Sequence, residues 1–186
     1  MIITITGKPC SGKSPACDHF CKTHNFDYVG AGNFFRTIAK KKGFSTVTNF
    51  QKPEQTKEVD EAIDSALTEI GIVRRNEDVI IDGRTAWHFI PHSFKVYVDV
   101  DWVSAGKRLL EEKRETEPAK DLDEAINMLQ SRHNNEIARY KALYNIDCLD
   151  MNNYDLVLNS TGKTTEQLSN EIYKAYQKFL KNKANK

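Results

Sequence analysis

The spacing of apolar residues changes along the chain between a pattern typical of strands and a pattern typical of helices. These changes divide the sequence into predicted strands and helices. Short apolar or β-branched runs, typical of buried strands, occupy residues 2–6, 27–29, 79–81, 94–100 and 156–158. Helical spacing or composition predicts helices over 11–24, 33–42, 54–70, 103–114, 121–143 and 165–180. We expect Gly71 to end the third of these helices.

Strands that alternate with helices of this length predict a parallel sheet with helices on both faces and right-handed crossovers. No internal repeat and no Pro/Gly/Ser-rich linker divides the 186 residues, so a single domain is expected. Ligands bind such sheets beyond the carboxyl ends of the strands. The loops after residues 6, 29, 82 and 100 should therefore carry the chemistry.

Charge and composition exclude several classes of function. Lys and Arg total 27 against 26 Asp and Glu, a net charge of +1, which argues against a disordered charged tail and against extensive phosphate-backbone binding. No apolar run approaches a membrane span, and the first residues lack the features of a signal peptide. We therefore expect a cytoplasmic protein without nucleic-acid or membrane partners, and a monomer. The four cysteines form no CxxC pair and are interpreted as reduced thiols: Cys10, Cys17, Cys21 and Cys148.

The loop after the first predicted strand carries the strongest motif. Its sequence, Gly7-Lys8-Pro9-Cys10-Ser11-Gly12-Lys13-Ser14, matches G-x-x-x-x-G-K-[ST] with a strand before it and a helix after it. The glycines let backbone N–H groups surround an anion at the positive end of the helix. Lys13 would reach the β- and γ-phosphates, and the Ser14 hydroxyl would bind Mg²⁺. The loop predicts binding of ATP or GTP.

Asp82 ends the third predicted strand, next to the expected position of this loop. Its carboxylate would either bind the same Mg²⁺ through water or cap a loop. Cys10, inside the phosphate loop, is interpreted as a tolerated variable residue; a redox switch is the alternative.

Arginines follow several of the predicted strands or share a helix face. Arginine is suited to bidentate recognition of phosphate, and several arginines in one crevice would suit two phosphorylated substrates. Arg132 and Arg139 lie seven residues apart, which places them on one helix face with Asn135 between them. Arg114 adjoins the Glu-Thr-Glu-Pro segment, a candidate lid. Each arginine alone is compatible with a solvated surface residue. The full set is Arg36, Arg84, Arg108, Arg114, Arg132 and Arg139.

Four motifs occur in a fixed order: residues 7–14, residues 30–36, Asp82-Gly83-Arg84 and the helix with Arg132 and Arg139. Over about residues 1–180, this order resembles nucleoside monophosphate kinases, most closely the short cytidylate kinase-like family. The resemblance implies a three-layer P-loop NTPase fold with a five-stranded parallel sheet. It also implies an acceptor-binding helical region at 33–75 and a short lid at 111–121.

The resemblance further implies that ATP, with Mg²⁺, donates its γ-phosphoryl group to CMP or dCMP. We expect Gly7 to Ser14 and Arg108 to bind ATP, and Ser14 and Asp82 to hold the metal. The catalytic set is Lys13, Arg84, Arg114, Arg132 and Arg139. The acceptor-binding set is Gly32, Phe35, Arg36, Arg84, Arg132 and Arg139.

Two residues depart from the longer bacterial cytidylate kinases, which carry Ser and Asp at positions that bear on nucleotide recognition. This chain has Ala31 and Thr85 there, whereas Thr85-Ala86-Trp87 is similar to the short family.

Other functions stay open. Another phosphate acceptor (a different nucleotide, shikimate, a sugar or dephospho-coenzyme A) would use the same loop, and so would a non-catalytic nucleotide-binding module. A GTP-dependent switch is disfavoured because Asn159-Ser160-Thr161-Gly162 lacks the Lys and Asp of a guanine motif. Among the aromatic and imidazole residues, Trp87 is expected in the core, and His133 at the surface or a helix end.

Overall fold

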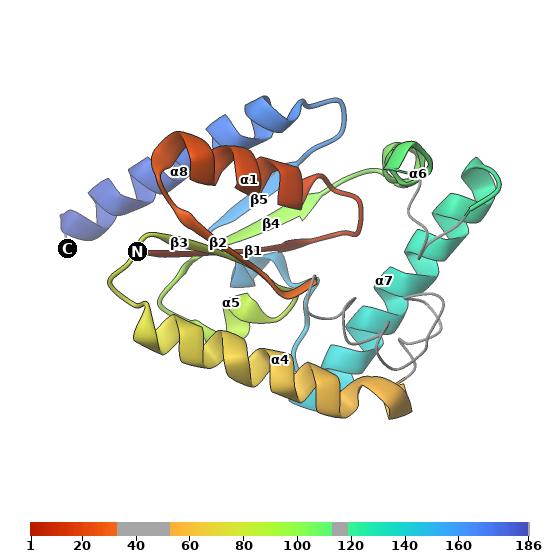
Figure 1. Ribbon diagram of the computed structural model, residues 1–186, viewed down its shortest axis with the longest axis horizontal. Coiled ribbons are helices and arrows are strands. Elements are labelled where there is room, and N and C mark those ends of the chain that lie inside the picture. Colours follow the sequence, from red (N-terminus) through yellow and green to blue (C-terminus); the bar gives the residue numbers. More distant parts are fainter. Residues whose placement is uncertain (33–52, 113–118, 186) are drawn as a thin grey trace.

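Five parallel strands form one sheet in the order β2-β3-β1-β4-β5, with the first strand at its centre (Figure 1). The computed structural model describes residues 1–32, 53–112 and 119–185. The five parallel strands confirm the sheet that was predicted from the sequence. The strands are β1 (Ile2–Gly7), β2 (Asp27–Gly30), β3 (Val79–Asp82), β4 (Phe94–Asp99) and β5 (Leu156–Asn159).

Helices cover both faces of the sheet, which confirms the three-layer architecture. α1 and α8 lie on one face and α4 and α5 on the other, while α6 and α7 stand beyond the carboxyl ends of the strands (Figure 1). The helices are α1 (Lys13–His24), α4 (Pro53–Val73), α5 (Ala86–Phe89), α6 (Trp102–Glu112), α7 (Leu122–Tyr144) and α8 (Thr165–Ala184), with a 3-10 turn η1 at Met151–Asn153. In the part of the chain that is described, no helix is long and apolar enough to cross a membrane.

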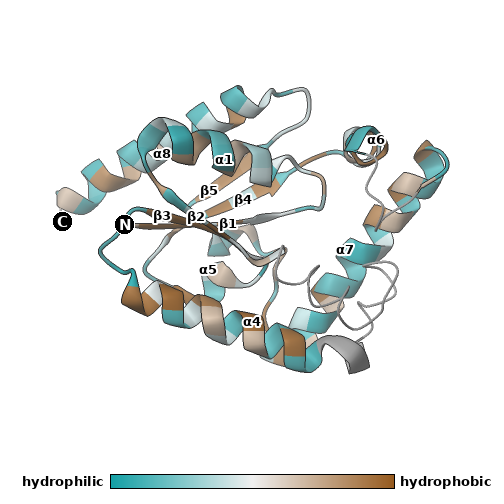
Figure 2. Ribbon diagram, in the orientation of Figure 1, coloured by the Kyte–Doolittle hydropathy of each residue, from teal (hydrophilic) through white to brown (hydrophobic). Residues whose placement is uncertain are grey.

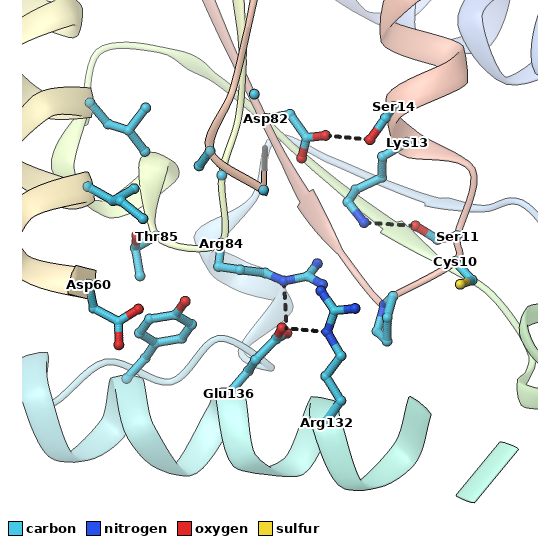
Figure 3. Close-up of a pocket in the computed structure, with 18 of the residues that line it drawn as sticks. Cys10, Ser11, Lys13, Ser14, Asp60, Asp82, Arg84, Thr85, Arg132 and Glu136 are labelled. Carbon is cyan, nitrogen blue, oxygen red and sulfur yellow. Dashed lines mark hydrogen bonds and ion pairs between the residues drawn. The ribbon is translucent and has the colours of Figure 1, made fainter. Parts of the chain in front are cut away.

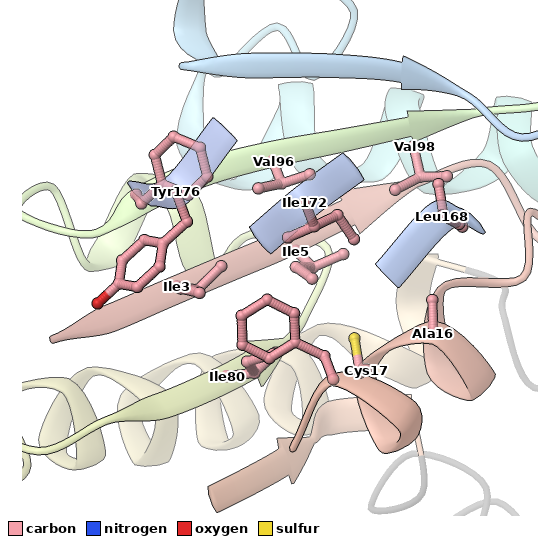
Figure 4. Close-up of a cluster of buried hydrophobic side chains, with 12 residues drawn as sticks. Ile3, Ile5, Ala16, Cys17, Ile80, Val96, Val98, Leu168, Ile172 and Tyr176 are labelled. Carbon is pink, nitrogen blue, oxygen red and sulfur yellow. The ribbon is translucent and has the colours of Figure 1, made fainter. Parts of the chain in front are cut away.

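The core lies on both sides of the central strands, which appear brown in Figure 2. All six residues of β1 are buried, including Thr4 and Thr6, as expected for a central parallel strand with helices on both faces of its sheet. On the α1/α8 face, Ile3 and Ile5 pack with Cys17 and Ile172 (Figure 4). Phe20 belongs to the same cluster. On the other face, Ile2, Val79 and Ile81 pack with Leu67 and Ile90.

The strand register gathers the chemistry at one edge of the sheet. Asp82 pairs with Ile5 of β1 and with Gly30 of β2, and Gly7 pairs with Val98 of β4. The carboxyl ends of four neighbouring strands therefore meet where the loop after β1 begins.

Some sequence predictions differ from the structure. Gly71 does not end α4, which continues to Val73. A Cβ on Gly71 would lie 2.8 Å from Ile90 Cδ1, so this glycine allows close packing between α4 and the segment after α5. The short helix α5 was not predicted. The predicted helix over 33–42 and the residues Phe35, Arg36 and Arg114 lie outside the described residues.

The role of Gly71 can be tested by a double substitution. Gly71→Ala should destabilise the protein by about 1–3 kcal/mol, because the new methyl group collides with buried Ile90. In an Ile90→Ala background the same change should stabilise by up to about 1 kcal/mol, the gain in helix propensity. Urea unfolding measures both effects. Equal destabilisation in the two backgrounds would contradict the packing explanation.

Candidate active site

The loop between β1 and α1 is held against the end of β4. Gly7 has a φ of 142° and a Cβ there would lie 2.0 Å from the Val98 carbonyl oxygen, so no other residue fits. Gly12, with a φ of 78°, precedes the first residue of α1. The Lys8 N–H donates to the Val98 carbonyl at 3.2 Å. The backbone conformation of the loop therefore requires glycine at these two positions of the motif.

Lys13 lies inside this loop and is 8% exposed. Its Nζ donates to the carbonyl of Lys8 at 2.9 Å and to Ser11 Oγ at 3.3 Å. Burial, followed by the positive charge of Arg84, lowers the pKa of Lys13 to about 8. A phosphate bound against the loop would favour the charged form of Lys13 and would so oppose the effects of burial and of Arg84 on its pKa. This behaviour is expected of a phosphate-binding lysine.

Ser14 and Asp82 meet beside the loop. Ser14 Oγ donates to Asp82 Oδ2 at 2.9 Å, and the Tyr28 hydroxyl donates to the same oxygen at 3.0 Å. A hydroxyl and a carboxylate are ligands that Mg²⁺ accepts. Within the described ranges no group of three His, Cys, Asp or Glu residues could hold a metal ion, so Mg²⁺ here would need phosphate and water as further ligands. The pair fits a metal that arrives with a nucleotide.

A buried carboxylate joins two arginines from different elements. Glu136, on α7, is 4% exposed. Its Oε2 lies 2.8 Å from Arg84 Nε, and its Oε1 lies 3.1 Å from Arg132 Nε (Figure 3). Arg84 comes from the end of β3, and it also donates to the Gly7 carbonyl. Glu136 thus fixes two guanidinium groups beside the loop that contains Lys13.

The charge state of Glu136 follows from this environment. Burial alone would raise the pKa of Glu136, but Arg84, and after it Arg132 and Arg139, lower it to about 2. The carboxylate is therefore ionised throughout the neutral range.

A second buried ion pair lies on the α4 side. Arg139 Nε is 2.7 Å from Asp60 Oδ2, and both side chains are at most 3% exposed. One helical turn further along α4, the Asp64 carboxylate accepts a hydrogen bond from the Thr85 hydroxyl. Figure 3 shows Asp60 and Thr85 on the side of the cleft away from Ser11 and Ser14.

These groups line one cleft of about 230 Å³. Its described lining carries four cationic side chains and five acidic ones, so the cleft is not uniformly basic, and several of the opposite charges lie against each other as ion pairs. The phosphate loop and the arginines occupy one side and the centre, whereas Asp60 and Asp64 face the cleft from α4. The charged residues are Lys13, Arg84, Arg132 and Arg139, and Asp60, Asp64, Asp82, Glu112 and Glu136.

Most of the predicted site residues that are described lie together at this cleft: Pro9, Cys10, Ser11, Gly12, Lys13, Ser14, Gly32, Asp82, Arg84, Arg132 and Arg139. Two predicted ATP-binding residues point elsewhere. Lys8 Nζ pairs with Asp99 Oδ1 at 2.8 Å. Arg108 donates to the Cys10 carbonyl at 3.1 Å and to the Ser160 carbonyl at 2.8 Å, and so braces the loop against the end of β5.

Asp82 was predicted from the sequence, but the other carboxylates of the cleft, among them Asp60, Asp64 and Glu136, were not. Asn135, predicted between the two arginines of α7, is exposed, and Glu136 occupies the cleft-facing position instead. Both Asn135 and Glu136 lie three or four residues from each arginine, so sequence spacing could not show which of the two faces the cleft. The expected surface position of His133 was also wrong, because its ring is buried against Trp102. Trp87 is in the core, as predicted.

Residues 2–162 match the cytidylate kinase-like family. The chain belongs to this family. A cytidylate kinase from Methanocaldococcus jannaschii is 31% identical over 97% of this chain and all of its own length. One from Methanothrix thermoacetophila is 32% identical with the same coverage. The family match covers every described residue of the cleft.

Two further comparisons concern the fold and a longer relative. An S-adenosylmethionine-dependent nucleotide dehydratase from Lacinutrix mariniflava is 29% identical over 95% of this chain, which spans 36% of that protein. The structure of shikimate kinase from Aquifex aeolicus has a TM-score of 0.57 at 19% identity and covers 95% of this chain and 96% of its own. At that identity the likeness shows a shared P-loop kinase fold.

The buried ion pairs make a prediction for acid stability. Glu136→Gln should lower the free energy of unfolding at neutral pH by on the order of 3 kcal/mol, the linkage value of a pKa lowered from 4.5 to about 2. Because the folded-state pKa is depressed, this stabilisation is complete above about pH 4.5 and is lost as the pH falls towards 2. The difference from wild type, measured by urea unfolding, should shrink over that interval.

Glu69→Gln is the matched control, since Glu69 is exposed on α4. It should change stability by less than about 0.5 kcal/mol. A difference between wild type and Glu136→Gln that is independent of pH would contradict the assignment of the ionised carboxylate.

Proposed function

We propose that this kinase transfers the γ-phosphoryl group of ATP to CMP or dCMP and yields ADP with CDP or dCDP. The observation that carries the proposal is the convergence of the Lys13 loop with Arg84 and Arg132 on one cleft, tied together by Glu136. Membership of the cytidylate kinase-like family and the cytidylate kinases at about 30% identity support the choice of acceptor.

The proposed donor site is the loop after β1. Backbone N–H groups at the start of α1, together with the Lys13 ammonium group, would hold the β- and γ-phosphates. Ser14 and Asp82 would hold Mg²⁺, which neutralises phosphate charge when it is bound. Arg108 would act indirectly, because its contacts fix the Cys10 carbonyl inside the loop.

The proposed acceptor phosphate lies at the centre of the cleft. Arg84 and Arg132 present guanidinium groups there, and they would bind the acceptor phosphate and the charge that develops on the transferring group. A phosphate oxygen is already anionic at neutral pH, so the acceptor needs no general base. Positioning and charge neutralisation by this chain's own side chains would supply the catalysis.

We further propose that residues 1–186 form a single kinase domain, with the acceptor-binding region at 33–75 and the lid at 111–121. The described part of the acceptor region includes α4, whose Asp60 and Asp64 line the cleft.

A coupled assay of ADP release tests the proposal. With ATP and Mg²⁺, CMP and dCMP should give the highest kcat/KM in a panel with UMP, AMP, GMP, shikimate and gluconate. Highest activity with shikimate or a sugar would refute the nucleotide assignment. Slow ADP release that no acceptor accelerates would indicate a non-catalytic binding module.

Lys13→Ala provides the matched variant for this assay. Loss of one charge-stabilising group at the reacting phosphate should lower kcat by at least about 100-fold. Lys22→Ala, on the exposed surface of the same helix, should leave activity unchanged. Full activity of Lys13→Ala would refute the assignment of the phosphate loop.

A further inference from the structure

A tyrosine outside the phosphate loop contacts the pair of residues that would hold the metal. Tyr28 lies on the edge strand β2, lines the cleft and is 37% exposed. Its hydroxyl donates to Asp82 Oδ2 at 3.0 Å, and Ser14 Oγ donates to the same oxygen at 2.9 Å. Tyr28 and Ser14 also interact with each other. Three side chains, from β2, β3 and α1, therefore form one polar cluster.

The backbone of β2 brings Tyr28 to this position. Gly30 is the register partner of Asp82 on β3. Residues two apart on a strand lie on the same face, so the Tyr28 ring extends along β2 across Gly30. A Cβ on Gly30 would lie 2.9 Å from Tyr28 Oη and 3.2 Å from the ring atoms Cε1 and Cζ. The missing side chain at Gly30 thus provides the space through which the hydroxyl reaches Asp82.

Two donors on one oxygen fix the direction of the Asp82 carboxylate. An ionised carboxylate has two acceptor oxygens, and both hydroxyls use Oδ2, which leaves Oδ1 for Mg²⁺ or for one of its waters. Ser14 donates its only side-chain hydrogen to Asp82, so the lone pairs of Ser14 Oγ are left for the metal as well. A single hydrogen bond would let the carboxylate rotate, whereas a second one from another strand holds it.

Groups that orient metal ligands without touching the metal have measurable effects. Their loss commonly weakens metal binding by about 10- to 100-fold. Tyr28 is partly exposed, so water can replace some of its hydrogen bond to Asp82. The expected effect of removing its hydroxyl is therefore at the lower end of that range.

We propose that Tyr28 is a positioning residue for the Mg²⁺ that accompanies ATP. It holds the Asp82 carboxylate so that Oδ1 stays available to the metal, and Gly30 makes room for its ring. This inference rests on the proposed function of the donor site and deepens it with two residues that lie outside the phosphate-loop motif.

Tyr28→Phe tests the proposal, because it removes the hydroxyl and keeps the ring. Calorimetry measures the Kd of the β,γ-imido analogue of ATP with Mg²⁺ and without it. With Mg²⁺, the substitution should raise the Kd by about 10-fold. Without Mg²⁺, the Kd should not change, because the phosphate loop itself is intact.

Two results of this experiment would overturn the proposal. Equal weakening with and without Mg²⁺ would show that Tyr28 only supports the shape of the cleft. An unchanged Kd in both conditions would show that the hydroxyl has no part in metal binding, and that any role of Tyr28 belongs to its ring.

Tyr173→Phe is the matched control. It removes the same hydroxyl from a ring that packs on Phe20 and His24 between α1 and α8, away from the cleft. Both Kd values should equal those of the unaltered protein.

Gly30→Ala provides a second variant in case Tyr28→Phe fails to fold. The new Cβ should displace the Tyr28 hydroxyl from Asp82 and cause the same loss of affinity, again only with Mg²⁺. In a Tyr28→Phe background, Gly30→Ala should cause no further loss that depends on Mg²⁺. Additive losses would overturn the proposal, since the two residues would then act independently.

The proposed function can fail separately. If the unaltered protein did not bind the ATP analogue in either condition, the donor site itself would be wrong. A protein that binds the analogue but shows no selective effect of Tyr28→Phe would refute only the role of Tyr28.

Discussion

The contact between Glu136 and two arginines is the interaction on which the cleft depends. Arg84 comes from the end of a central strand and Arg132 from α7, and Glu136 binds both while it is almost fully buried. Removal of one partner from such a group leaves an uncompensated charge, so the three side chains hold one another in place. Because Arg84 also contacts the Gly7 carbonyl, the arrangement of α7 is coupled to the phosphate loop.

This coupling changes how the basic groups of the site should be understood. Their positive charge is balanced in advance by carboxylates, so the cleft holds guanidinium groups in fixed directions rather than as a pool of repelling cations. The Lys13 ammonium group is the exception: burial and Arg84 lower its pKa, and an arriving phosphate would offset both effects. Fixed donors of this kind need little reorganisation during phosphoryl transfer.

The sequence allowed the sheet, its helices and the phosphate loop to be predicted, because strand and helix periods and the glycine motif are local patterns. The strand end at Asp82 and the helix of Arg132 and Arg139 were also found from local signals. The carboxylates Glu136, Asp60 and Asp64 were not, since a charged residue on an amphipathic helix has the same pattern whether it faces solvent or a buried arginine. Gly71 was misinterpreted for a similar reason: its partner Ile90 is distant in sequence.

The central claim is that two nucleotides meet end to end across Glu136 and its arginines. The most direct test is calorimetric binding of a bisubstrate analogue, in which a pentaphosphate joins adenosine to cytidine. The account predicts binding that requires Mg²⁺ and is at least about 100-fold tighter than that of ATP, since one molecule would engage both sites. An affinity no greater than that of ATP would contradict it.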